Sequence, residues 1–273
     1  MPFKLFCALC FLLLLLLLPF LTLAQTYHNI SCGSSIVAQE NSTPWSSPSG
    51  EFAFGFQKLG TGFILAIWFD KIPEKTIVWS ANGNNLAQEG STVELTTLGQ
   101  LVLNDPPEEQ QLLSDLQPQG PGAAYAAMLD TGNFVLANQE SYNLWESFDQ
   151  PTHTFLPTQS VGSVLFSPYT ATNYSKGRFQ LKLESNGDVV LYTTNFPLNS
   201  TNFPYKTIEP SPSSDPVDAD SAFHVIFNQS GFIYVTDRNG TLRSIVSGKT
   251  VSTQNFYQRA TLDYDGVFRH YIY

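Results

Sequence analysis

Cysteine is scarce in this chain, with three residues in 273. Cys7 and Cys10 lie in an apolar N-terminal run, so a chain processed after that run keeps Cys32 alone. A single thiol excludes an intrachain disulfide. Because there is no second thiol and the histidines are scattered, we expect no metal site and interpret Cys32 as a small buried side chain.

Charge is also low. Only 13% of the residues are charged, and the net charge is −10. An acidic surface repels phosphate backbones, and no basic stripe interrupts it. We therefore expect no nucleic-acid partner.

Catalytic patterns are missing as well. The sequence has no Ser/His/Asp order, no His-Glu-x-x-His pair and no phosphate-binding glycine loop. The neighbouring acids Glu108 and Glu109, or Asp263 and Asp265, could serve a glycosidase only by facing each other across a cleft. Neighbouring acids in turns are usually solvated, so we expect no catalytic residue, no cofactor and no enzymatic activity.

One long apolar run is present, from Leu5 to Pro19. The small residues Thr22 and Ala24 follow it, and polar residues begin at Gln25, which predicts a secretory signal peptide over residues 1–24, cleaved after Ala24. An uncleaved membrane anchor is the alternative, and Pro19 disfavours it by interrupting the run. We expect secretion of the mature chain.

Six Asn-x-Ser/Thr sequons follow the predicted signal peptide, none with proline in the middle position. In a secreted chain such sequons are acceptors for N-linked glycans. The predicted glycosylation sites are Asn29, Asn41, Asn173, Asn199, Asn228 and Asn239.

Helical periodicity is nearly absent beyond the signal peptide. Short runs rich in Val, Ile, Phe, Tyr and Thr recur between turn-forming residues, which predicts an all-β fold. Five segments share one pattern, in which a glycine-containing turn separates two apolar strands, and glycine supplies the positive φ of a tight hairpin. Repeated hairpins of this kind bury their faces by packing around a shared core. The hairpins are Leu95–Leu103, Leu129–Leu136, Leu183–Leu191, Phe227–Val235 and Leu262–Phe268.

These hairpins divide into two groups at Leu144–Gln159. We predict one domain over residues 25–148 and a second over residues 149–273. Within the second, the proline-rich segment Tyr205–Asp220 is typical of a flexible loop. The four tryptophans are interpreted as core or sheet-closing residues: Trp45, Trp68, Trp79 and Trp145.

Five ordered motifs carry a family resemblance: Ser47–Phe56, Ile67–Pro73, Ile77–Asn82, Met128–Leu136 and Leu144–Thr152. They resemble the ectodomain signature of plant G-type (bulb-type) lectin S-receptor-like serine/threonine kinases. The match is strong in the first half of the chain and weaker in the second. The resemblance implies tandem β-prism II (bulb-type lectin) domains, each with three antiparallel sheets, and a role in extracellular recognition.

The resemblance implies a receptor in which a cysteine-rich region, a membrane helix and a kinase follow the lectin part. None of these regions has a counterpart in the sequence, and no kinase motif occurs in it. We therefore expect a non-catalytic product of the plant apoplast, or a plasma-membrane ectodomain where the gene continues past Tyr273.

Mannose-binding members of the wider bulb-lectin family resemble one another in a Gln-x-Asp-x-Asn-x-Val-x-Tyr strand, whose alternate side chains share one face. On the first hairpin the motif keeps Val102, and on the second it keeps Asn133 and Val135. The third hairpin keeps a polar residue at each polar position as well as the valine and the tyrosine. The candidate carbohydrate-binding residues are therefore Glu184, Asn186, Asp188, Val190 and Tyr192, and an ordinary solvent-facing polar row is the alternative interpretation.

Two functions follow from these observations. The first is a carbohydrate-recognition module of the mannose-type lectin-like kind, with microbial or cell-wall glycans or glycoproteins as partners. The second is a protein-protein interaction ectodomain, or a soluble decoy of full-length receptor kinases, that has lost sugar binding. The erosion of the sugar motif favours the second, while the fold signatures are compatible with both.

Overall fold

The computed structural model describes residues 28–106, 111–113, 122–162, 164–195, 200–208, 223–248, 251–253 and 255–273. The predicted signal peptide, Glu108, Glu109 and Asn199 lie outside these ranges. The described chain forms strands, with one 3-10 turn, η1, at Ser147–Asp149. The predicted all-β class is confirmed.

Three four-stranded antiparallel sheets come from the first half of the chain. Each consists of a hairpin flanked by one earlier and one later strand. The first is β3 (Trp45–Ser46), β4 (Phe52–Leu59), β5 (Gly62–Phe69) and β6 (Ile77–Ser80); the second is β2 (Ser35–Val37), β7 (Thr92–Leu95), β8 (Leu101–Asn104) and β9 (Gln111–Leu112); the third is β1 (Ile30–Ser31), β10 (Tyr125–Met128), β11 (Phe134–Ala137) and β12 (Asn143–Glu146).

Three further sheets come from the second half; two repeat this arrangement, and the third consists of a hairpin and one earlier strand. Their strands are β15 (Leu165–Thr170), β16 (Asn173–Leu183), β17 (Val189–Asn195) and β18 (Ser200–Ile208); β14 (Ser160–Val161), β19 (His224–Phe227), β20 (Ile233–Thr236) and β21 (Leu242–Ser247); and β13 (Thr154–Phe155), β22 (Gln258–Leu262) and β23 (Phe268–Ile272).

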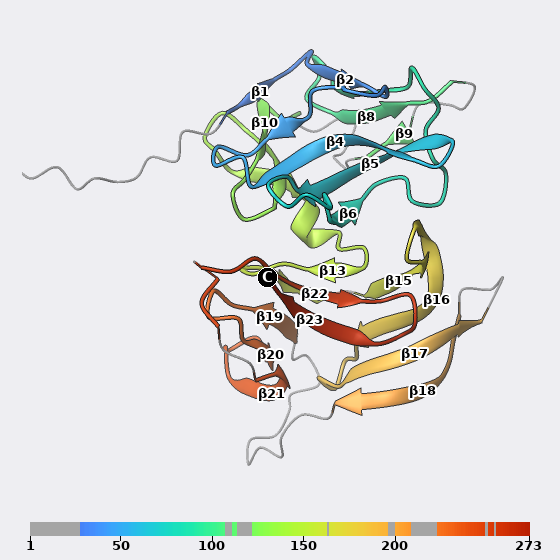
Figure 1. Ribbon diagram of the computed structural model, residues 1–273. Coiled ribbons are helices and arrows are strands. Elements are labelled where there is room, and N and C mark those ends of the chain that lie inside the picture. Colours follow the sequence, from blue (N-terminus) through green and yellow to red (C-terminus); the bar gives the residue numbers. More distant parts are fainter. Residues whose placement is uncertain are drawn as a thin grey trace, which may run out of the picture.

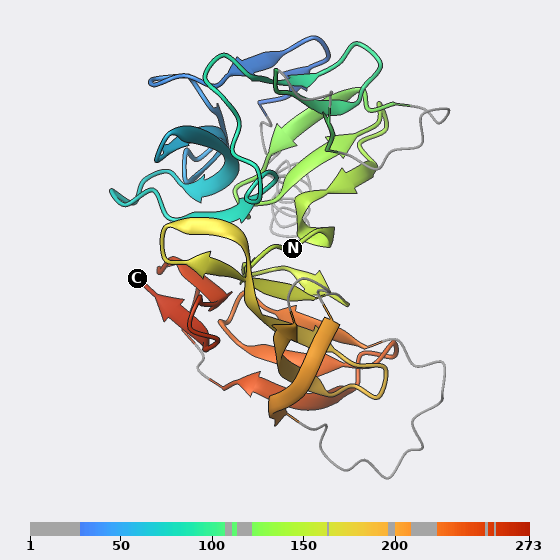
Figure 2. The same ribbon diagram turned by 90° about the vertical axis from the view of Figure 1, so that its right-hand side faces the viewer.

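The strand order is nested in the same way in both halves. In each half, the first three strands pair in reverse order with the three hairpins that follow. In the first half, β3 pairs with β4, β2 with β7 and β1 with β10. In the second half, β15 pairs with β16, β14 with β19 and β13 with β22. Three sheets around one core form a β-prism, and the chain contains two such prisms, one above the other in Figure 1 and seen from the side in Figure 2. The expected tandem β-prism II fold is confirmed.

The five predicted hairpins are all present, and the glycine in each turn has a positive φ, between 72° and 89°. The connections are short and each is closed by backbone hydrogen bonds across the turn. The local signal in the sequence therefore locates these hairpins correctly: β7–β8, β10–β11, β16–β17, β19–β20 and β22–β23.

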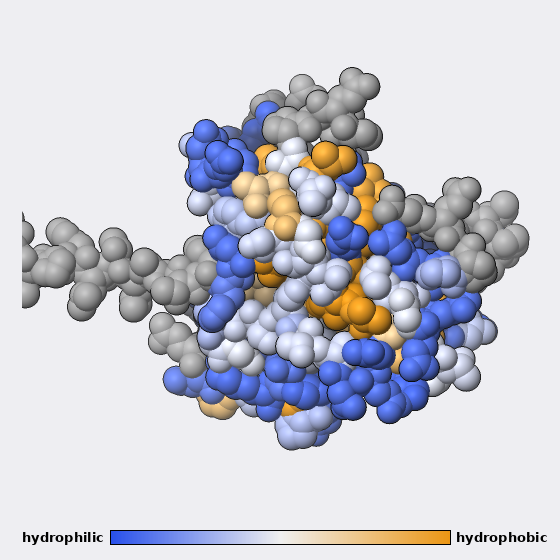
Figure 3. Space-filling model, turned by 90° about the horizontal axis from the view of Figure 1, so that it is seen from above, coloured by the Kyte–Doolittle hydropathy of each residue, from blue (hydrophilic) through white to orange (hydrophobic). Residues whose placement is uncertain are grey.

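Each prism has its own apolar core. In the first, the ring of Phe54 stacks on Phe134 with the centroids 4.2 Å apart, and Trp45 stacks on Phe54 at 5.6 Å. Trp68, Trp79 and Trp145 are buried and Trp45 is half-buried, as their interpretation as core residues requires. Seen from above, the surface shows apolar residues toward its centre and hydrophilic residues along much of its rim (Figure 3).

The two prisms also share apolar contacts. Strand β5 is buried along its whole length, because the inner face of its sheet packs on the core while Tyr174 of β16 packs against the outer face. Tyr257, which precedes β22, contacts Phe69 at a centroid distance of 5.2 Å. Leu156 joins the core of the first prism. The prisms are therefore packed against each other.

One sequence expectation was wrong in part. The segment Tyr205–Asp220 was expected to be a loop, but its first four residues belong to β18, in which Lys206 pairs with Leu191 of β17. Residues 205–208 contain no proline, and they pair with the edge of β17 through a long-range contact that the local sequence does not predict. Residues 209–220 lie outside the described chain.

Candidate functional site

The candidate sugar-binding residues lie on the β16–β17 hairpin. The Glu184 amide donates to the Asp188 carbonyl (2.8 Å), and the Gly187 amide donates to the Glu184 carbonyl (2.9 Å). Gly187 has φ +89° and faces the Phe223 ring, where an added Cβ would lie 2.9 Å from the nearest ring carbon. Both its conformation and its surroundings require glycine.

Two side-chain pairs order the polar row. Tyr192 Oη donates to Glu184 Oε1 (2.9 Å), joining the second strand to the start of the turn. Asn186 Nδ2 donates to Asp188 Oδ2 (2.8 Å), while the Asp188 amide donates to Asn186 Oδ1 (3.1 Å). The phenol and the amide are thus held in fixed orientations.

These side chains line a surface depression of about 440 Å³. All five candidate residues border it, together with Ser185 and, from the neighbouring strand β18, Pro204 and Thr207. Pro204 lies opposite Tyr192 and Thr207 lies opposite Val190 in the sheet. The sequence did not identify Pro204 and Thr207, because their approach depends on the pairing of β18 with β17.

The depression is negatively charged, with two carboxylates and one nearby cation. Lys182 Nζ lies 3.4 Å from Glu184 Oε1. Burial, the hydrogen bond to Glu184 and the negative charges of Glu184 and Asp188 together raise the pKa of the Tyr192 phenol. Tyr192 therefore stays protonated at neutral pH and acts as a donor.

Such a surface can exchange hydrogen bonds with vicinal hydroxyl groups. The carboxylates of Glu184 and Asp188 accept, the amide of Asn186 donates and accepts, and the Thr207 hydroxyl does both. Val190 is 4% exposed and contributes a small apolar patch. The two carboxyl groups belong to one turn rather than to opposing walls of a cleft, unlike the arrangement used for glycoside hydrolysis.

The second hairpin cannot present its motif residues in the same way. Asn133 is buried, donates to Glu146 Oε2 (2.6 Å) and accepts from Ser147 Oγ (3.1 Å). Its amide therefore has a structural role. On the first hairpin, Leu98 is exposed where the motif has an aspartate, and it offers no hydrogen bond.

The fifth hairpin contains a related arrangement that the sequence analysis missed. Tyr271 Oη donates to Asp263 Oδ2 (2.6 Å), with the same spacing along the chain as Tyr192 and Glu184. Here Arg269 stands where the third hairpin has Val190, and its guanidinium lies 2.8 Å from both Asp263 and Asp265. The eight-residue spacing of Asp263 and Tyr271 is the sequence signal that could have identified this arrangement. Unlike the third hairpin, this one has an arginine that neutralises its carboxylates.

The remaining predicted positions are scattered over the surface. Asn29, Asn41, Asn173 and Asn239 are exposed, whereas Asn228 is half-buried and its Oδ1 accepts the amide of Ser230 (2.9 Å). Cys32 is half-buried rather than buried, and its thiol lies 3.4 Å from the Ala123 carbonyl. In the described part of the chain, no group of three His, Cys, Asp or Glu residues could hold a metal ion.

Among the residues that the structure describes, there is no helix with the length and apolar character to cross a bilayer.

Comparison with known proteins gives a family model and several relatives that match the chain. Residues 76–176, from the start of the β6 region into β16, match the family model described as D-mannose binding lectin. The chain is 42% identical to the G-type lectin S-receptor-like serine/threonine-protein kinase LECRK3 of Oryza sativa subsp. indica, over 95% of this chain and 33% of the relative. It is 41% identical to the kinase of the same class named RLK1 from Arabidopsis thaliana, over 84% of this chain and 29% of the relative.

Among solved structures, the fetuin-binding Scilla campanulata agglutinin, a two-domain lectin, is matched with a TM-score of 0.28 and 11% identity, over 87% of this chain and 97% of that one. The fold and the family model together assign the chain to the bulb-type lectin class of domains. The chain belongs to the plant G-type lectin S-receptor-like kinase family, with whose lectin part it aligns, and it spans about a third of the length of these curated relatives.

Proposed function

We propose that this chain is an extracellular carbohydrate-recognition module of the mannose-type lectin-like kind, without catalytic activity. Its sugar contacts are Glu184, Asn186, Asp188, Val190 and Tyr192. One observation supports this proposal above all others: these five side chains border a single depression of about 440 Å³, where hydrogen-bonding groups surround a small apolar patch. Partners are glycans or glycoproteins of microbial or cell-wall origin.

Binding at this site is weak for a single sugar. Each new hydrogen bond replaces one to water, and the internal pairs Tyr192–Glu184 and Asn186–Asp188 compete with the ligand. We expect a Kd of order 1 mM for a monosaccharide. Stronger binding then requires several chains acting on one multivalent glycan.

The proposed setting is the extracellular space. The signal peptide over residues 1–24 directs the chain there, and the two prisms are bulb-type lectin domains over residues 25–148 and 149–273. N-linked glycans at the predicted sequons would stand on exposed side chains at Asn29, Asn41, Asn173 and Asn239. These positions do not border the β16–β17 depression, so glycans there leave the site open.

The test is a titration of residues 25–273 with methyl α-mannoside, preceded by a glycan array that selects other sugars. We expect Tyr192→Phe to weaken binding about three- to tenfold and Asp188→Ala to weaken it by more than about tenfold, since the latter removes a charged acceptor. Tyr271→Phe is the matched control, because it removes the same kind of tyrosine–carboxylate bond outside the site.

A second function is supported by the internal pairing of the polar row. Because Tyr192 and Asn186 already have protein partners, the row needs no sugar to satisfy them. If the folded protein binds no glycan on the array, the lectin proposal fails. The chain is then a protein-protein interaction ectodomain or a soluble decoy, and co-precipitation with full-length receptor kinases becomes the next measurement.

A further inference from the structure

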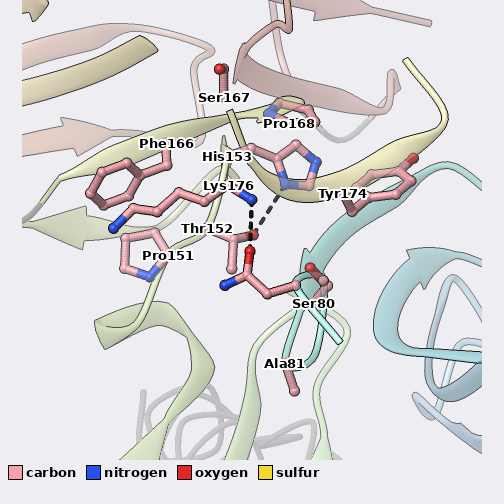
Figure 4. A pocket seen from close by; sticks show the side chains of 12 residues that line it. Ser80, Ala81, Pro151, Thr152, His153, Phe166, Ser167, Pro168, Tyr174 and Lys176 are labelled. Carbon is pink, nitrogen blue, oxygen red and sulfur yellow. Dashed lines mark hydrogen bonds between the residues drawn. The ribbon is translucent and has the colours of Figure 1, made fainter. Parts of the chain in front are cut away.

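A second cavity lies between the two prisms, away from the β16–β17 turn. Its volume is about 200 Å³. The first prism contributes Ser80 at the end of β6 and Asn84 from the following loop; the second contributes Phe166 of β15 and both Tyr174 and Lys176 of β16. The junction segment Pro151–His153 closes one side (Figure 4).

The walls of this cavity are fixed by contacts between the prisms. The Lys176 amide donates to Asn84 Oδ1 (2.9 Å), which links β16 to the loop after β6. A Cβ added to Gly83 would lie 2.3 Å from the Tyr174 carbonyl oxygen, so the two backbones are in close contact. The cavity is therefore preformed.

Lys176 is the charged group of the cavity. Its side chain extends toward Phe166 (Figure 4), and Nζ lies 3.4 Å from the centre of that ring. The other cavity-lining residues include no Asp, Glu or Arg. His153 is buried, and burial lowers its pKa to about 4, so it is neutral at pH 7.

The ammonium group of Lys176 lacks an acidic partner in the described chain. Four other described lysines each have a carboxylate within 4.0 Å: Lys58, Lys71, Lys75 and Lys182. Lys206, the remaining described lysine, is exposed, whereas Lys176 is half-buried and burial lowers its pKa. A partly desolvated cation in a chain of net charge −10 is a binding group for an anion.

The rest of the lining suits a sugar ring. Pro151, Phe166 and Tyr174 offer apolar surface for C–H groups. Ser80 and Asn84 carry hydroxyl and amide groups of the kind that can pair with sugar hydroxyls. The cavity is smaller than the roughly 300–1,000 Å³ typical of drug-sized ligands. A cavity of this size suits a single sugar residue.

We propose that this cleft between the prisms binds one residue of a saccharide that carries a carboxylate, the chemical class of a uronic acid, with the carboxylate on Lys176 and the ring against Phe166 and Pro151. The proposal does not depend on sugar binding at the β16–β17 hairpin. Its chemistry is different, since the hairpin site is acidic and disfavours an anion.

The test compares acids with their neutral counterparts. Residues 25–273 are titrated with D-glucuronic and D-galacturonic acid, and separately with D-glucose and D-galactose, by ligand-observed NMR. We expect the acids to bind in the mM range and more tightly than the neutral sugars, and added NaCl to weaken them. Lys176→Gln should weaken acid binding by about tenfold or more, and Lys176→Arg should retain most of it.

Arg178→Gln is the matched control, because it removes one positive charge from the same strand outside the cavity. It should leave acid binding unchanged. Equal binding of acids and neutral sugars, no acid binding by the folded protein, or unchanged binding by Lys176→Gln would overturn the proposal. Tighter binding of inorganic phosphate than of either acid would contradict the assigned ligand class.

Discussion

At the scale of single residues, His153 shows how burial at the junction between the prisms changes the pKa of a side chain. It is 6% exposed, its Nδ1 lies 3.1 Å from Thr152 Oγ1, and its ring packs beside Tyr174 at 5.4 Å. Burial, partly offset by a hydrogen bond to the Ile77 backbone, lowers its pKa to about 4. The imidazole is thus neutral in the folded state over the whole neutral and mildly acidic range.

This shift predicts a pH-dependent stability. Between about pH 6.5 and pH 4 the unfolded chain binds a proton at His153 and the folded chain does not, so stability falls as pH falls through this window. The loss attributable to His153 approaches about 3 kcal/mol at pH 4. Denaturant unfolding measured between pH 7 and pH 4.5 tests this expectation.

The matched pair for this measurement is His153→Gln and His224→Gln. His153→Gln should flatten the pH dependence of the unfolding free energy, whereas His224→Gln, at a half-buried position on β19, should leave it in place. Parallel curves for wild type and His153→Gln would show that this histidine is not the source.

At the scale of elements, the glycine turns are the units from which both prisms are built. Gly187 combines φ +89° with an added Cβ position 2.9 Å from Phe223, whereas Gly240 has φ +79° and no atom within 4 Å of that position. The two residues therefore separate the conformational requirement from the packing requirement.

We expect Gly240→Ala to lower the free energy of unfolding by about 1–2 kcal/mol through φ alone. Gly187→Ala should cost about 1–3 kcal/mol more, because the methyl group must displace the Phe223 ring. Urea unfolding of both variants measures the difference. Equal losses would mean that the ring moves aside freely and that packing adds nothing at Gly187.

These turns also explain what the sequence could predict. A hairpin is encoded locally, by glycine between two alternating apolar strands, and all five expected hairpins are present. Strands of two residues such as β1, β13 and β14 have no pattern of their own and exist because a hairpin edge binds them. The start of residues 205–220 likewise forms part of β18 only because it pairs with β17.

The candidate site likewise contains residues that the local sequence predicts and residues that only strand pairing brings to it. The row from Glu184 to Tyr192 follows from the two-residue period of one strand and its turn. Thr207 and Pro204 border the same depression only because β18 pairs with β17. The interprism cavity depends entirely on contacts between residues distant in sequence, such as Asn84 and Lys176. No local sequence pattern predicts it.

At the scale of the whole molecule, the two prisms are held together by a packed contact. Tyr174 covers the outer face of the β3–β6 sheet, Tyr257 packs on Phe69, and Trp79 Nε1 donates to the Gln150 carbonyl (2.7 Å). We expect such a contact to couple the unfolding of the two prisms.

Gly83→Ala tests this coupling. Its Cβ would lie 2.3 Å from the Tyr174 carbonyl oxygen, whereas the nearest atom to a Cβ at Gly162 is 3.5 Å away. We expect Gly83→Ala to separate the calorimetric unfolding into two transitions and Gly162→Ala to leave it as in the wild type. A single unchanged transition in Gly83→Ala would show that the coupled unfolding of the two prisms does not depend on this contact.

The most direct test of the proposed function is a chemical-shift map of residues 25–273 during titration with methyl α-mannoside. The site predicts saturable changes at Glu184, Asn186, Asp188, Val190 and Tyr192, with Thr207 of β18 following on the same mM curve. Saturable changes confined to other hairpins, or no changes at all in the folded protein, would contradict a sugar site on β16–β17.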